Sequence, residues 1–262
     1  MPVSYSQMLH SFREEEGVFV ASVSDDWMQG RTAYGGLAAA LSLEGTLRAR
    51  PALPPLRSAQ ISFIGPAGGE VRIEPRLLRQ GKSVAFVGVD LISNEALAAR
   101  SVFAFGAARS SRYDASYMHA PPLRSPDECA PYVPEGKGPP FASHFDTRLI
   151  KGGRPMTGSA EHDHYIWVRH RDERARSLSA LVALADMPPP AMMPMFPEFA
   201  PISTVTWSFN MLADNPETVD GWWLLETRAE NAAAGYSSQD MIVWDRMGRA
   251  VIAGRQSVAI FI

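Results

Sequence analysis

The sequence predicts an α+β protein in which one structural unit occurs twice. Each half of the 262-residue chain contains a helix-forming segment and several long, alternating apolar segments. A proline-rich stretch separates the halves, and Gly81-Lys82-Ser83 and Gly235-Tyr236-Ser237 open similar strand–turn–strand patterns 154 residues apart. Long strands following a single helix are typical of an antiparallel sheet wrapped around that helix, and two linked copies could share one sheet.

The first half is predicted to contain one long helix and four strands. Apolar residues such as Leu37, Leu41 and Leu47 give residues 33–50 a broad apolar face, and Gly35-Gly36 fall in the first turn. Strands are predicted at 58–65, 70–80, 83–93 and 96–106. The short turn Ser93-Asn94-Glu95 joins the last two of these strands as a hairpin.

The middle of the chain has the composition of a linker. Residues 109–141 contain seven prolines and little apolar periodicity. We therefore divide the chain into a first repeat at 1–108, a linker at 109–141 and a second repeat at 142–262.

The second half is predicted to repeat the same elements. A helix at 177–187 has Ser177 as its N-cap, and Pro188-Pro189-Pro190 must end it, because proline lacks the amide donor. Strands are predicted at 143–151, 161–171, 202–212, 221–231, 237–245 and 249–261.

Composition excludes several classes of protein. A formal net charge of -3 provides no basic excess for a nucleic-acid backbone, and no segment is apolar enough to cross a membrane. The single cysteine, Cys129, rules out an internal disulfide framework and a Cys-based zinc site. No nucleotide-binding glycine motif and no signal peptide are recognisable, so we expect a cytoplasmic protein without a cofactor.

Five short motifs, in order along the chain, resemble those of TesB-like acyl-CoA thioesterases. They are Gly30–Gly36, Leu77–Ser83, Trp167–Arg169, Ala183–Asp186 and Gly254–Gln256. The resemblance implies a double hotdog fold, in which each of two helices is wrapped by an antiparallel sheet. It also implies an acyl-CoA substrate, hydrolysed to a free acid and CoA, and a homodimer.

In that family an aspartate, a hydroxyl and a glutamine hold the water that attacks the thioester. The resemblance places these roles on Asp186, Thr204 and Gln256. The strand 202–207 departs from the family pattern because it lacks the usual Asp-His pair. Thr206, expected on the same strand face as Thr204, and Ser203 are therefore alternatives for the hydroxyl.

The residues themselves support two of these roles. Asp186 ends an apolar helix, where burial would raise its pKa towards the value a general base needs, although a solvent-facing aspartate is the simpler alternative. Alternation places Gln256 on an apolar strand face, where it needs a partner. Its counterpart at the repeat offset is Val102, so one active site, in the second half, is expected.

Other interpretations remain open. His162 and His164 share a strand face, but one pair cannot complete a metal site, and exposed strand-edge histidines are the simpler account. The segment 187–199, rich in methionine and phenylalanine, is suited either to an acyl pocket or to core packing. A non-catalytic acyl-CoA-binding protein and an enoyl-CoA hydratase or dehydratase are the alternative functions.

Overall fold

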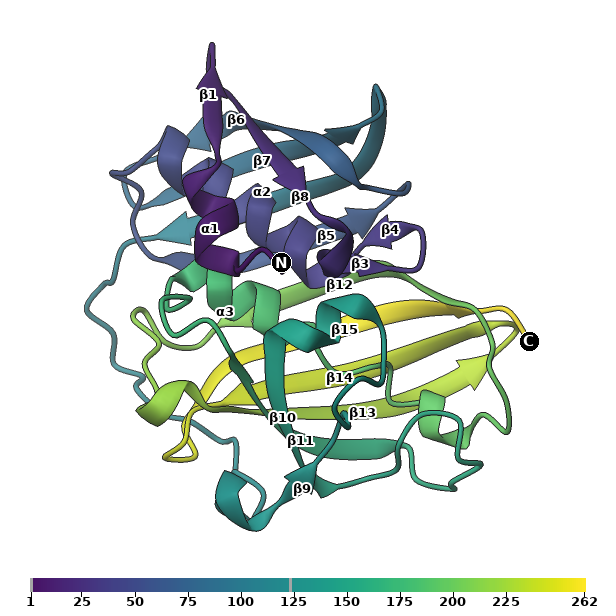
Figure 1. Cartoon of the computed structure of the whole chain (residues 1–262). Coiled ribbons are helices and arrows are strands. Elements are labelled where there is room, and N and C mark those ends of the chain that lie inside the picture. The colour runs from purple at the N-terminus through teal and green to yellow at the C-terminus, as the bar shows by residue number, and fades with distance from the viewer. Residues whose placement is uncertain (1, 123) are drawn as a thin grey trace.

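A computed structural model of the chain, which describes residues 2–122 and 124–262, contains one 13-stranded antiparallel sheet and a separate two-stranded ribbon. Met1, in the predicted first repeat, and Leu123, in the predicted linker, lie outside the described residues. The strand order is β1-β2-β6-β7-β8-β5-β12-β15-β14-β13-β11-β10-β9. Figure 1 shows the purple and blue first half meeting the green and yellow second half along this sheet.

The strands are long in both halves. In the first half they are β1 (Arg13–Glu15), β2 (Val18–Val23), β3 (Met28–Gln29), β4 (Thr32–Ala33), β5 (Leu56–Phe63), β6 (Gly69–Gln80), β7 (Val84–Ser93) and β8 (Ala96–Gly106). In the second half they are β9 (Ala130–Pro131), β10 (Phe145–Lys151), β11 (Asp163–His170), β12 (Ile202–Met211), β13 (Trp223–Ala233), β14 (Tyr236–Trp244) and β15 (Ala250–Ile260). The helices are α1 (Tyr5–His10), α2 (Gly35–Ala49) and α3 (Leu178–Ala185).

The two halves share the sheet through β5 and β12. Ile61 pairs with Trp207 and Ala59 with Phe209, all four of them buried. The expectation that one sheet runs across both halves is therefore confirmed.

Helices α2 and α3 pack against each other on the inner face of this sheet (Figure 1). They run antiparallel, because Gly36 near the start of α2 meets Ala183 near the end of α3. A Cβ at Gly36 would lie 2.6 Å from the Ala183 carbonyl oxygen, so only glycine allows this approach. The Tyr34 hydroxyl donates to the same carbonyl at 2.7 Å. This crossing brings the N-terminus of α2 to the C-terminus of α3.

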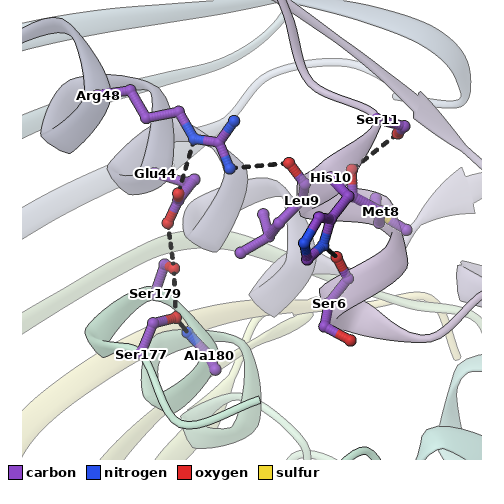
Figure 2. Close-up of polar contacts among 10 residues, drawn as sticks. All are labelled: Ser6, Met8, Leu9, His10, Ser11, Glu44, Arg48, Ser177, Ser179 and Ala180. Carbon is purple, nitrogen blue, oxygen red and sulfur yellow. Dashed lines mark hydrogen bonds and ion pairs between the residues drawn. The ribbon is translucent and has the colours of Figure 1, made fainter. Parts of the chain in front are cut away.

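A hydrogen-bonded chain ties the other ends of these helices to α1, as Figure 2 shows. Ser179 Oγ donates to Glu44 Oε2 at 2.7 Å, and Arg48 donates to Glu44 Oε1 and to the Leu9 carbonyl, both at 2.8 Å. The Ser177 hydroxyl caps α3 by accepting from the Ala180 amide at 3.1 Å. Two donors of Arg48 and one of Ser179 thus link α1, α2 and α3.

The predicted helices and hairpins are present, with small shifts at their ends. Helix α2 begins at Gly35 rather than residue 33, and α3 ends at Ala185 because Asp186 is its C-cap. The prediction missed α1, β1, β2, β3, β4 and β9, all of them six residues or fewer in length. None of the helices in the described ranges is long and apolar enough to span a membrane.

Most described residues of the segment predicted as a linker are exposed, but a few of its side chains pack on the core. Its described part contains only short 3-10 turns and β9 before β10 begins. Phe141 is buried and stacks on Tyr34, with ring centroids 4.1 Å apart, and Tyr132 is also buried. The end of this segment therefore covers the start of α2.

Candidate active site

Asp186 lies where the two helices meet. It is the C-cap of α3, and an added Cβ on Gly35 of α2 would be 2.9 Å from its Oδ2 atom. Burial raises the pKa of Asp186 to about 7, although hydrogen bonds from Gln256 and the Gly36 backbone act to lower it. The residue as a whole is partly exposed, although its carboxyl is buried. The expectation of a raised carboxyl pKa at this helix end agrees with this environment.

The N-terminus of α2 supplies backbone donors beside this carboxyl. Tyr34 is the N-cap, and its carbonyl accepts the first intrahelical bond, from the Ala38 amide at 3.1 Å. The amides of the first turn therefore have no carbonyl within the helix to bond. Such a helix end attracts negative charge, which offsets the unfavourable placement of Asp186 at the C-terminus of α3.

Gln256 of β15 is buried and contacts Asp186 directly. Its Nε2 atom donates to Asp186 Oδ1 at 2.5 Å. Its Oε1 atom accepts from Gln239 Nε2 of β14 at 2.6 Å, and Gln239 Oε1 accepts from the Ala191 backbone amide at 2.9 Å. We call these three links the amide chain. The expectation that Gln256 has a polar partner is confirmed, and it has two.

A β-bulge in β12 changes the placement of the candidate hydroxyls. Thr204 pairs with Val258, whereas Thr206 pairs with the next residue along β15, Ser257, so the two threonines face opposite sides of the sheet. The expectation that they share a face is therefore wrong. Thr204 is half-buried on the inner face, while Thr206 is exposed.

The structure brings Asp186 and Gln256 together but does not link Thr204 to them. In the described part of the chain no hydrogen bond joins the Thr204 hydroxyl to either residue. The residue opposite Gln256 on β12 is the buried Trp207. Ser203, the other alternative, is exposed.

The first-half counterpart of Gln256 is not Val102. Across the sheet, Trp207 pairs with Ile61 and Ile61 pairs with Ser101, which is buried. Val102 is the next residue on β8 and faces the other side. The hairpin loops differ in length between the halves, so a constant offset does not preserve the strand face.

The two halves nevertheless differ along this row of paired residues. The row begins at the pair of Trp207 and Ile61, where the two halves meet. In the second half it continues to Gln256 of β15 and then Gln239 of β14. In the first half it continues to Ser101 of β8 and then Val89 of β7. The amide chain therefore exists in one half, and the expectation of one polar site in the second half agrees with this asymmetry.

Sequence reasoning missed two inner-face residues of β14. One is Gln239, and its polar side chain at a buried alternating position was the signal available. The other is Ser237, whose hydroxyl is buried and has no hydrogen-bond partner among the described residues. Ser237 pairs with Val258, the same residue that Thr204 pairs with on the other side.

The two histidines do not resemble a metal site. His162 is exposed, but His164 is fully buried, so the expectation that both are exposed is wrong for His164. Burial lowers the pKa of His164 to about 4, which keeps its ring neutral. Within residues 2–122 and 124–262, no three His, Cys, Asp or Glu side chains are grouped to hold a metal ion.

The segment after Asp186 folds back over the inner face of β14. Ala191 and Phe196 are buried, while Met195 and Phe199 are exposed. The Met156 amide donates to the Met193 carbonyl at 2.9 Å, which joins this loop to the one between β10 and β11. The segment thus provides both core packing and a partly exposed apolar wall.

The comparisons with known proteins agree with this architecture. A solved protein of unknown function with a hot dog fold, from Alicyclobacillus acidocaldarius, superposes with a TM-score of 0.88 at 22% identity, covering 97% of each chain. The acyl-CoA thioesterase II TesB2 of Mycobacterium marinum gives 0.78 at 16% identity, also covering 97% of each chain. The fold is therefore a double hotdog.

The family follows from the sequence profiles. The acyl-CoA thioesterase N-terminal domain profile matches residues 23–106, and the C-terminal domain profile matches residues 126–260. The chain belongs to the acyl-CoA thioesterase family. A search of curated protein sequences gives no significant match.

Proposed function

We propose that this protein hydrolyses an acyl-CoA thioester to a free carboxylic acid and CoA, with Asp186 as the general base. The observation that carries this proposal is the contact between Asp186 and Gln256 beside the N-terminus of α2. It combines a carboxyl whose pKa is about 7 with an amide that can orient water and with backbone donors. Membership of the family supports an acyl-CoA substrate.

The reaction requires water to be activated between these groups. Ionised Asp186 takes a proton from water as the water oxygen attacks the thioester carbonyl carbon. The carbonyl oxygen becomes an oxyanion, which the first-turn amides of α2 other than that of Gly36 stabilise. Collapse of the tetrahedral intermediate breaks the C–S bond, and the proton on Asp186 passes to the departing CoA thiolate. Asp186 is thereby restored.

Gln256 and Thr204 are proposed to orient the water. Gln256 Nε2 donates one hydrogen to Asp186 and has a second N–H that can donate to the water. Of the three hydroxyls weighed from the sequence, Thr204 alone is partly buried on the inner face, while Ser203 and Thr206 are exposed. Thr204 therefore remains our proposal for the hydroxyl.

Free-thiol release from short-, medium- and long-chain acyl-CoA esters tests the function. The proposal expects stoichiometric thiol and acid with at least one ester. CoA-ester binding without thiol release from any ester would contradict it and support a binding protein. Hydration of an enoyl-CoA without thioester cleavage would contradict it in favour of a hydratase.

A further inference from the structure

We propose that Gln239 is a positioning residue, which holds the Gln256 amide in the orientation that presents Nε2 to Asp186. The Ala191 backbone amide sets the direction of the whole amide chain. This inference rests on the proposed function, because it assigns Gln239 a role in preparing the general base.

The direction follows from which groups can only donate. A backbone N–H is a donor alone, so Gln239 must turn its Oε1 atom towards Ala191, where the distance is 2.9 Å. Its Nε2 atom then faces β15 and donates to Gln256 Oε1 at 2.6 Å. Gln256 is left with Nε2 on the side of Asp186. The fixed backbone donor at one end therefore determines the amide orientation at the other.

Without Gln239, nothing in the described chain would hold the Oε1 atom of Gln256. The oxygen and nitrogen ends of a carboxamide have nearly the same shape, so packing alone does not distinguish them. Turned around, Gln256 would place an oxygen against the Asp186 carboxylate. Because a donated hydrogen bond favours the ionised carboxyl, that reversal would disfavour the form that accepts a proton from water.

Burial makes this arrangement demanding. Gln239 is 2% exposed and Gln256 is 4% exposed, so bulk solvent cannot replace the hydrogen bonds of the amide chain. The fold does not require amides here, since Val89 and Ser101 occupy the corresponding row of the first half. The pair of buried glutamines is thus confined to the half that contains Asp186.

The amide chain also joins the active site to the loop that follows α3. Ala191 is five residues after Asp186 in sequence and is fully buried. Displacement of this loop would remove the donor that orients Gln239. The position of the loop is therefore coupled to the orientation of Gln256.

The test is a double-mutant cycle with Gln239→Met and Gln256→Met, measured by kcat and by the pH dependence of kcat. We expect Gln239→Met to lower kcat by about 10-fold, since a hydrogen bond to a charged group is lost or reversed, and to move the acid limb to higher pH. In the Gln256→Met background, Gln239→Met should change neither quantity further. Thr227→Val, which alters another buried polar residue of the inner face, is the control and should leave both unchanged.

A second variant covers the case in which Gln239→Met does not fold. Gln239→Leu also removes both polar atoms of the side chain and leaves the Oε1 atom of Gln256 without its donor. The loss of kcat should therefore match that of Gln239→Met. Parent-like kcat and pH dependence in either folded variant would overturn the proposal. The proposal would also be overturned if Gln239→Met lowered kcat equally in the parent and in the Gln256→Met background, because Gln239 would then not act through Gln256.

A carboxyl ¹³C titration separates this inference from the proposed function. The Asp186 resonance is assigned by its absence in Asp186→Asn, and its pKa should be higher in Gln239→Met than in the parent. An unchanged pKa would overturn the positioning role whether or not the protein hydrolyses thioesters. If the pKa rises in a protein that cleaves no acyl-CoA, the proposed function fails while the positioning of Gln256 stands.

Discussion

Replacing Asp186 by asparagine should stabilise the protein at neutral and alkaline pH. Burial raises the pKa of Asp186 from 3.8 to about 7, so ionising it in the folded state costs about 4 kcal/mol more than in the unfolded chain. Asparagine avoids this cost. Asparagine keeps an oxygen for the Gln256 donor, but its amide nitrogen cannot accept from the Gly36 amide. The loss of that hydrogen bond costs about 1–2 kcal/mol. The net gain at pH 8 is therefore about 2–3 kcal/mol.

The pH dependence gives this prediction its sign. A carboxyl with a raised pKa binds its proton more tightly in the folded state than in the unfolded chain. Its contribution to the free energy of unfolding is therefore fully present below about pH 4. That contribution falls as the pH rises and is lost once the pH passes about 7. The advantage of Asp186→Asn should therefore grow between pH 4 and 7 and then remain constant.

Urea unfolding of the parent and Asp186→Asn, at half-unit steps from pH 4 to pH 8.5, measures this difference directly. Other titrating groups cancel when the two proteins are compared at each pH. Asp240→Asn is the control, because Asp240 is a partly exposed partner of Arg255 and should give a small, nearly constant difference. If the difference in free energy of unfolding between the parent and Asp186→Asn does not change with pH across this range, burial does not raise the pKa of Asp186 and the reasoning is refuted.

Three further predictions concern the site and the assembly. Gly35→Ala should lower kcat by up to about 10²-fold, because its Cβ would displace the Asp186 carboxyl, whereas Gly81→Ala, which meets only ordinary contacts, should not. Thr204→Val should lower kcat about tenfold by removing one water-orienting hydroxyl, and the exposed Thr206→Val should have no effect; the reverse result would move the site to the other sheet face. Light scattering should give about twice the 28.7 kDa chain mass, because β1 and β9 leave two free sheet edges that a second copy could cover, and a monomer mass at micromolar concentration would contradict this.

Sequence patterns predicted the elements that depend on local chemistry. The Ser177 cap, the proline stop after Asp186 and the tight turn at Asn94 each act within a few residues, and each lies where it was expected. The contact between Asp186 and Gln256 was reached through the resemblance and through the buried position of a polar residue. These signals are visible in a single sequence.

The remaining differences arise from features that do not follow a fixed period. The bulge at Val205 reverses the face of Thr206, because one extra residue shifts every later position on the strand. The hairpin loops of the two halves differ in length, so the constant offset pointed to Val102, which lies on the opposite sheet face from Ser101 in the row of Gln256. Gln239 escaped notice because its importance depends on pairing with Gln256 across two strands.

The most direct test of the proposed mechanism is the rate of acyl-CoA hydrolysis by Asp186→Asn at pH 8, on the ester that the parent cleaves fastest. The amide keeps the shape of the side chain but cannot take a proton from water, so kcat should fall by about 10²–10⁴-fold. Unfolding at the same pH shows that the variant is folded, and Asp240→Asn should retain the parent rate. If folded Asp186→Asn releases thiol as fast as the parent, Asp186 is not the general base and the mechanism is wrong.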